Sequence, residues 1–203
     1  MSSKFQNFWY YYKFHVIVIF FIALSIVIAV LLTGKRTDPD IQIGYVTDGR
    51  EISEEAKANI NKYFENVITD VNEDNEKLLS FIPLIGPRVD LEFASDGAQI
   101  ILMDSNTLVK YKDMGALEPL DAFVKKHGMD VSGNTEVMSR AEGDNVEHIF
   151  ALPMRNIKFL LDAGFPAEDY YLTVRVEYDK NKESNIKNKN AYAIMDQMLD
   201  YKE

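Results

Sequence analysis

A run of apolar residues at positions 14–32, FHVIVIFFIALSIVIAVLL, constrains this chain more than any other feature. It contains no Asp, Glu, Lys or Arg. At about 1.5 Å rise per residue, a helix of this length matches the roughly 30 Å hydrocarbon core of a bilayer and satisfies its own backbone hydrogen bonds. The sequence therefore predicts a transmembrane helix over residues 14–33, with the lipid bilayer as its partner.

The flanks of this run favour an uncleaved anchor over a cleaved secretory signal. A signal peptide has a shorter apolar core that ends at small residues such as Ala-x-Ala, and the sequence AVLLT at positions 29–33 offers no such site. The aromatic residues WYYY at positions 9–12 are typical of a belt at headgroup level. We interpret residues 1–13 as a cytoplasmic tail with an aromatic belt. A buried core helix with aromatic flanks is the alternative.

Charge alone does not fix the orientation, because two lysines before the run nearly balance Lys35 and Arg36 after it. A short tail followed by a long hydrophilic domain is usual in single-span proteins that translocate their C-terminal part. We therefore expect a single-pass protein of the cell membrane with its N-terminus in the cytoplasm. Residues 34–40 would form a linker, and residues 41–203 one extracytoplasmic domain.

Composition excludes several classes of partner. All 32 acidic residues follow the apolar run, against 22 basic residues in the whole chain, and the formal net charge is −10. This sign argues against nucleic acid and against flat adhesion to anionic lipid. The simplest role of this negative charge is to keep the domain soluble. The chain has no cysteine, so disulfides and thiolate chemistry are absent.

The hydrophobic pattern after residue 40 predicts alternating strands and helices. The expected strands are 41–47, 89–93, 98–103, 148–154 and 170–177. The expected helices are one capped by Ser53 and reaching about residue 71, one at 105–114, one at 119–126, one at 156–162 and a last one after a Lys- and Asn-rich loop. This order predicts an α/β domain with a largely parallel sheet and flanking helices.

The middle of the chain resembles the first lobe of the extracytoplasmic solute-binding proteins that serve ABC importers. The likeness lies in residues 90–128, DLEFASDGAQIILMDSNTLVKYKDMGALEPLDAFVKKHG, where a strand like AQIILMD is followed by a helix and by a phrase like GALEPLDAF. HIFALPM at 148–154 resembles the strand that leaves this lobe toward the hinge, and AGFPAEDYYLTVRV at 163–176 extends the likeness. The resemblance implies the fold of one lobe of a type II periplasmic binding protein.

Two further points qualify this resemblance. A full binding protein closes on its ligand between two lobes of similar size, whereas this sequence holds one lobe's worth of residues. The anchor, with WYYYKFH at 9–15, resembles that of small single-span proteins of Gram-positive bacteria whose function is unknown.

An open parallel sheet binds ligands at the carboxyl ends of its strands, and three predicted loops lie there. They follow the first three predicted strands, and the candidate ligand-binding residues are Asp48, Gly49, Asp96, Asp104, Ser105 and Asn106. Such groups suit a polyol, an amine or a hard divalent cation. The alternative is that Asp-Gly pairs form turns and that Ser105 or Asn106 caps a helix.

Catalytic and metal-binding motifs are missing from the sequence. It has no Gly-x-Gly-x-x-Gly, Walker loop, His-Glu-x-x-His or Gly-x-Ser-x-Gly. Residues 70–76 begin like a calcium loop, but Asn75 stands where Gly is needed and Phe81 where the bidentate Glu belongs. The three histidines are isolated in the sequence. We expect no catalytic residue, no metal site, no cofactor and no enzyme activity.

Two functions from different classes fit these observations. The first is a membrane-anchored, extracytoplasmic binding or interaction module that holds a small solute or a protein. The second is a structural or accessory subunit of a membrane transporter complex, in which the span itself would have a partner. The span offers no Gly-x-x-x-Gly face for such a partner. An enzyme is a third alternative.

Overall fold

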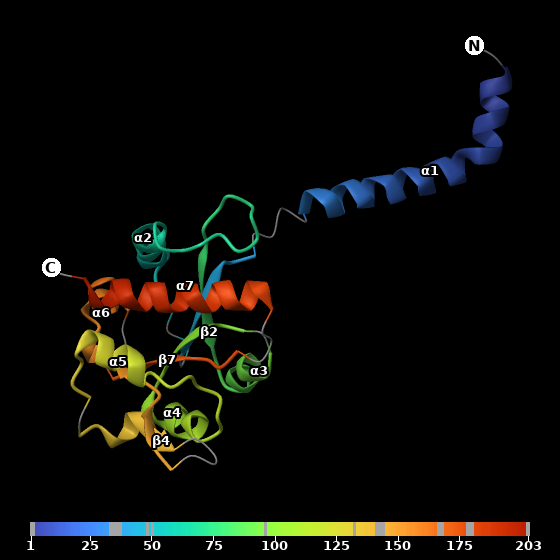
Figure 1. Ribbon diagram of the computed structural model, residues 1–203. Coiled ribbons are helices and arrows are strands. Elements are labelled where there is room, and N and C mark those ends of the chain that lie inside the picture. The colour runs from blue at the N-terminus through green and yellow to red at the C-terminus, as the bar shows by residue number, and fades with distance from the viewer. Residues whose placement is uncertain are drawn as a thin grey trace. The chain divides into compact units, whose positions relative to one another are not determined.

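The computed structural model describes residues 3–32, 38–47, 49, 51–95, 97–131, 133–140, 145–165, 169–177 and 181–201 (Figure 1). The chain forms two compact units, Met1–Thr37 and Asp38–Glu203. The first unit holds a single helix, and the second holds the α/β domain.

The N-terminal helix α1 spans Ser3–Leu32. Its segment Phe8–Ala29 is long and apolar enough to cross a membrane, and it is the one helix with this property in the part of the chain that the structure describes. The hydroxyl of Ser25 donates to the carbonyl of Phe21 at 2.8 Å, so this polar group is satisfied within the helix. The helix begins before residue 14 and includes the exposed aromatic residues of the predicted belt.

The domain is built on a five-stranded sheet in the order β2-β1-β3-β7-β6. The strands are β1 (Ile41–Val46), β2 (Leu79–Leu84), β3 (Ile100–Met103), β6 (Leu152–Pro153) and β7 (Tyr171–Val174). Strands β2 and β3 run parallel to β1 on either side, whereas β7 runs antiparallel to both β3 and β6. The α/β class is confirmed, and the sheet is mixed, because β7 runs opposite to the direction that β1, β2, β3 and β6 share.

The second predicted strand is wrong, because residues 89–93 lie in helix α3 (Arg88–Ala94). Val89 and Phe93 are four residues apart and both are buried, which is helical spacing. The strand that pairs with β1 is β2, which contains Pro83. Proline is tolerated there because β2 is the edge strand of the sheet, where one side of the backbone needs no partner.

Helix α2 (Glu54–Phe64) begins as predicted. The hydroxyl of Ser53 accepts the backbone N–H of Ala56 at 3.1 Å, and two glutamates follow in the first turn. The helix ends at Phe64 rather than near residue 71, because the chain turns at 65–67. Its buried stripe consists of Ala56, Ile60 and Phe64.

The second half of the domain differs from the prediction in two places. The expected strand 148–154 is divided between β5 (Glu147–Ile149), which pairs with β4 (Met138–Arg140) in a separate two-stranded sheet, and β6 in the main sheet. The Lys- and Asn-rich segment, which we predicted as a loop, belongs to helix α7 (Lys182–Leu199). The other elements are α4 (Ser105–Lys112), α5 (Asp121–His127), α6 (Lys158–Asp162) and the 3-10 turns η1 (Thr135–Val137) and η2 (Met154–Asn156).

The core lies on both faces of the sheet. All four residues of β3 are fully buried, as in a strand that is covered on both faces of the sheet. An aromatic cluster joins α2, α6 and the end of α7: Phe159 stacks on Tyr63 with ring centroids 4.2 Å apart and meets Tyr201 at 5.2 Å. A stacked pair, Phe93 and Tyr111, joins α3 to α4 at 4.0 Å.

Candidate functional site

The carboxyl ends of the three parallel strands meet at one edge of the sheet. Val46, Leu84 and Met103 end β1, β2 and β3 there, and we call this the carboxyl edge. The backbone N–H of Thr47 donates to the carbonyl of Leu84 at 3.1 Å, which holds the first two ends together. Because β7 is antiparallel, its first residue Tyr171 also lies at this edge, opposite Met103.

The loop after β1 shows turn chemistry in its described part. Gly49 has a φ of +110°, a conformation that favours glycine. Its N–H donates to the hydroxyl of Thr47 at 3.2 Å. Asp48 lies outside the described residues.

The loop after β3 uses its carboxylate to start a helix. Asp104 is the N-cap of α4, with Oδ1 accepting the backbone N–H of Thr107 at 2.9 Å and Oδ2 accepting its hydroxyl at 3.2 Å. Ser105 and Asn106 are the first two helical residues. The predicted capping role therefore belongs to Asp104, whose two oxygens are already engaged by the protein.

The third predicted loop lies at the opposite edge of the sheet. Because residues 88–94 form a helix, Ser95 and Gly97 lead into the amino end of β3. Asp96 itself lies outside the described residues. The structure thus brings Gly49 and Asp104 to one edge but does not bring the Ser95–Gly97 region to them.

A cavity of about 600 Å³ opens at the carboxyl edge beside β6 and β7. Its polar side chains come from three segments, namely the stretch around η1, the turn η2 and the start of β7. They are Asp130, Asn134, Glu136, Arg155, Asn156 and Tyr171. Tyr171 pairs with Pro153 in the sheet, which fixes this cavity at the carboxyl edge. We call it the edge cavity.

Tyr171 and Glu136 form the polar wall of the edge cavity. The Tyr171 hydroxyl donates a short hydrogen bond to Oε2 of Glu136. Burial of the ring raises the pKa of Tyr171, and the hydrogen bond to the Glu136 carboxylate adds to this increase, while the Asn134 side chain and the charge of Arg155 act in the opposite direction. The hydroxyl therefore stays protonated well above neutral pH and remains a donor.

Asn134 adds an amide to the same wall. Its Oδ1 accepts the backbone N–H of Glu136 at 3.2 Å, which begins η1. Its Nδ2 is buried and has no hydrogen-bond partner of normal geometry within the described part of the chain.

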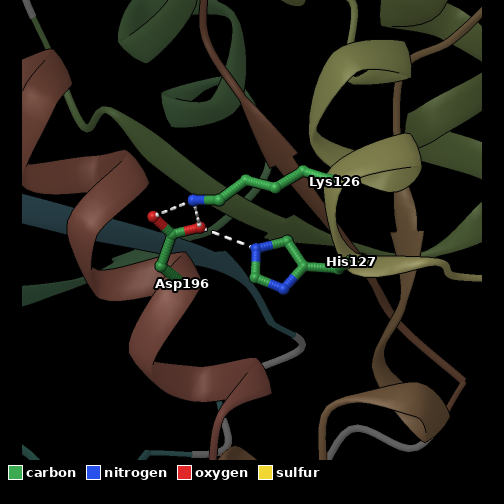
Figure 2. A network of polar contacts seen from close by, with 3 residues as sticks. All are labelled: Lys126, His127 and Asp196. Atoms are coloured by element: carbon green, nitrogen blue, oxygen red, sulfur yellow. Dashed lines mark hydrogen bonds and ion pairs between the residues drawn. The ribbon is translucent and has the colours of Figure 1, made fainter.

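A second polar cluster joins α5 to α7 (Figure 2). The Lys126 ammonium donates to both oxygens of Asp196 at 2.7 Å, and Nε2 of His127 lies 2.7 Å from Asp196 Oδ1. Partial burial acts to raise the pKa of Asp196, but the hydrogen bonds from Lys126 and His127 together lower it below its ordinary value. A cleft of about 430 Å³ beside His127 shares Asp130 and Asn156 with the edge cavity.

Histidine pairing was not visible in the sequence. His127 meets Asp196, which is 69 positions away, and Nδ1 of His148 lies 3.0 Å from Oδ2 of Asp121. Both pairs hold α5, one at its last residue and one at its first. Within the described ranges, no group of three or more His, Asp or Glu residues is arranged to hold a metal ion.

The acidic loop at 70–76 uses its side chains to shape itself. The two carboxylate oxygens of Asp70 accept the backbone N–H groups of Glu73 and Asn75 at 2.7 and 2.8 Å. Glu73 and Asn75 have positive φ angles of 58° and 68°. Asp74 accepts the N–H of Glu76 at 2.8 Å. These hydrogen bonds show that the carboxylates of Asp70 and Asp74 stabilise the turns of this loop.

Comparison with known proteins assigns no family to this chain. The sequence matches no protein-family model, and no curated protein shows significant similarity to it. A function for the domain can therefore be proposed only from the geometry and the side chains of its surface.

Proposed function

We propose that residues 41–203 form a non-catalytic binding module that holds a small polar solute in the edge cavity. The observation that carries this proposal is a cavity of about 600 Å³ at the carboxyl edge, on which side chains of Glu136, Arg155 and Tyr171 converge. Ligand sites in open α/β sheets lie outside the carboxyl ends of the strands. The volume of this cavity lies within the range of small-molecule sites, and its lining is mostly polar, which suits a polar solute.

We propose further that the domain corresponds to one lobe of a type II binding protein. Three features support this. Residues 90–128, which carry the resemblance, include β3, α4 and α5, so that the strand and helices expected from the family occur in order. β6 ends at Pro153, within the segment that resembles the exit toward the hinge. The edge cavity adjoins this exit, because Pro153 and Arg155 both line it.

We propose that α1 anchors the module in the cell membrane, with residues 41–203 outside the cytoplasm. The support is a single apolar helix, Phe8–Ala29, followed by an acidic hydrophilic domain. Carbonate washing should leave the intact chain in the membrane fraction, and protease added to whole cells should remove the domain. Release by carbonate, or complete protection from protease, would contradict the anchor or its orientation.

Solute binding is tested with the full chain in lipid nanodiscs. The single tryptophan, Trp9, lies in α1, so its fluorescence does not report on the domain, and we would use calorimetry and near-UV circular dichroism. A solute at 100 times its Kd should stabilise the domain by about 2.7 kcal/mol. Tyr171→Phe removes a hydroxyl from the cavity wall and should weaken binding, whereas Tyr192→Phe on α7 serves as the matched control.

The result also separates this function from that of a transporter subunit. A transporter subunit should show no stabilisation by any solute, and it should co-purify with a membrane partner in mild detergent. That combination would replace the binding module by the accessory role.

A further inference from the structure

Helix α1 is longer than a membrane span requires. It covers Ser3–Leu32, and its uncharged run at 14–32 is by itself about 28 Å long, close to the roughly 30 Å hydrocarbon core of a bilayer. Residues 3–13, which we call the pre-span segment, belong to the same helix and add about 16 Å to its length. The bilayer core is therefore filled before the helix reaches this segment, which has to lie outside the hydrocarbon.

The pre-span segment has an apolar face and a polar face. In the sequence, Phe8, Trp9 and Tyr12 follow Phe5 by three, four and seven positions, which is the spacing of one face of a helix. The rings of Phe8 and Tyr12 stack with their centroids 5.2 Å apart, so these two side chains do share a face. The other positions carry polar groups, namely Lys4, Gln6, Asn7, Tyr10, Tyr11 and Lys13.

The aromatic side chains of this segment divide between the two faces. Phe8, Trp9 and Tyr12 on the apolar face are 49%, 46% and 53% exposed. Tyr10 and Tyr11 on the polar face are 72% and 70% exposed, and their rings meet edge to face at 5.3 Å. About half of each ring on the apolar face is thus uncovered by protein, and a lipid interface can cover it.

The direction and the charge of the segment both suit a membrane surface. Figure 1 shows that α1 is not straight, because its dark-blue first part turns away from the axis of the long remainder. When the remainder crosses a bilayer, this turn carries the segment along the surface instead of straight into water. The segment contains Lys4 and Lys13, and the first acidic residue of the chain is Asp38. Lysine side chains at this level reach the phosphates of lipid headgroups.

We propose that the pre-span segment is an amphipathic helix that lies in the plane of the membrane surface. Phe8, Trp9 and Tyr12 lie at the boundary between headgroups and acyl chains, whereas Tyr10 and Tyr11 face the water. Basic helices with Trp and Phe on one face bind membrane interfaces in this way. The inference rests on the proposed membrane anchor. It replaces a belt of four aromatic residues around an upright helix by a second, lateral attachment of α1 to the leaflet on its N-terminal side.

The test measures the membrane depth of a tryptophan that is moved along the segment. Trp9 is the only tryptophan of the chain, so each variant combines Trp9→Phe with one of Phe8→Trp, Tyr10→Trp, Tyr11→Trp and Tyr12→Trp. The full chain is placed in vesicles of phosphatidylcholine and phosphatidylglycerol, and depth is measured from quenching by lipids brominated at different acyl carbons. Positions 8, 9 and 12 should lie deeper than 10 and 11 by more than about 5 Å, because a helix with its side chains is about 10 Å across.

An upright helix predicts a different pattern, in which depth changes in one direction from position 12 to position 8 by about 1.5 Å per residue. Phe20→Trp, again with Trp9→Phe, is the control, because residue 20 lies near the middle of the uncharged run. Depths that change in one direction, with a deep tryptophan at position 20, would leave the anchor intact and overturn the inference. A tryptophan at position 20 that brominated acyl chains do not quench would overturn the proposed anchor as well.

Discussion

The two edges of the main sheet use their polar residues in opposite ways. At the amino edge, where β1 and β3 begin and β7 ends, buried polar side chains bond to backbone groups. At the carboxyl edge, the side chains of Glu136 and Arg155 are exposed over a cavity. The contrast teaches that the polar side chains of one edge hold the fold together, whereas the charged side chains at the other edge are exposed to solvent.

Asp40 shows how the amino edge is held. It is 1% exposed and directly precedes β1. Its two carboxylate oxygens accept the backbone N–H groups of Val71 and Leu78 at 2.6 and 2.8 Å. Asn190 on α7, also 1% exposed, donates to the carbonyl of Asp40 at 3.3 Å. A charge buried without such partners would destabilise the domain strongly.

Arg175, the residue after β7, also holds the amino edge through hydrogen bonds to the backbone. Its side chain is buried, and its guanidinium donates to the carbonyls of Ser95, Gly97 and Ala98 at 3.0, 3.2 and 3.1 Å. Gly97 is required by this packing, since a Cβ there would lie 2.3 Å from Oε1 of Glu92. Ser95 and Gly97, which flank the predicted ligand-binding residue Asp96, thus belong to a structural junction.

The largest predicted effect compares two arginines, one at each edge. Arg175→Met removes a donor from the buried carbonyls of Gly97 and Ala98, of which Gly97 keeps the Gln99 amide, and from the part-buried carbonyl of Ser95. Because an unsatisfied buried group costs about 1–3 kcal/mol, the free energy of unfolding should fall by about 3 kcal/mol. Arg155→Met at the carboxyl edge should change it by no more than about 0.5 kcal/mol. Urea unfolding followed by near-UV circular dichroism measures both. Equal losses would contradict the division between the edges.

A second comparison uses two asparagines on α7. Asn190 accepts the backbone N–H of Thr69 at 2.9 Å and donates to its carbonyl at 2.8 Å. Asn190→Ala should therefore lower the free energy of unfolding by about 2 kcal/mol. Asn185, which is exposed and donates only to the carbonyl of Asn181 at 2.8 Å, should tolerate alanine within about 0.5 kcal/mol. A small loss at Asn190 would mean that water replaces its bonds.

Much of the fold follows from local sequence signals. The cap at Ser53 was predicted because it joins residues only three positions apart in the sequence. Helix α3 was missed because its sequence alternates apolar and polar residues like a strand. Yet in the structure Val89 and Phe93 are buried, while Leu91 between them is 67% exposed. Strand β2 was missed because Pro83 argues for a loop unless the strand is known to lie at an edge.

The edge cavity could not be predicted from the sequence. Glu136 and Tyr171 are separated by 35 positions, and Arg155 lies between them in a different turn. These residues meet only because β7 runs antiparallel to β3, which puts Tyr171 at the carboxyl edge. A parallel β7 would have placed Tyr171 at the amino edge. No local pattern in the sequence reports that direction.

A smaller effect tests whether the carboxyl edge also has a structural part. Asp104→Ala removes the cap of α4 and should lower the free energy of unfolding by about 1 kcal/mol, measured without ligand. Ser105→Ala, one residue later, should have almost no effect because its position is already helical. If Ser105→Ala were the more damaging of the two, the assignment of the cap to Asp104 would be wrong.

The smallest effect concerns the cluster of Lys126, His127 and Asp196 that joins α5 to α7 (Figure 2). Because the pKa of the Asp196 carboxyl is lower in the folded than in the unfolded chain, its contribution to stability is complete above the unfolded value, near 4, and is lost as the pH falls through the folded value. At pH 5, Asp196→Asn should reduce the free energy of unfolding by about 0.5 kcal/mol, as for a partly exposed ion pair.

That difference between the wild type and Asp196→Asn should shrink as the pH is lowered from 5 toward 3, because protonation of Asp196 makes the two proteins alike in charge. Asp200→Asn is the matched control, since Asp200 directly follows α7 and forms no ion pair with another described residue. A difference that grew on acidification would mean that the folded state favours the protonated carboxyl. The contact between α5 and α7 would then depend on packing, such as that of Phe123 against the His127 ring, rather than on the charge of Asp196.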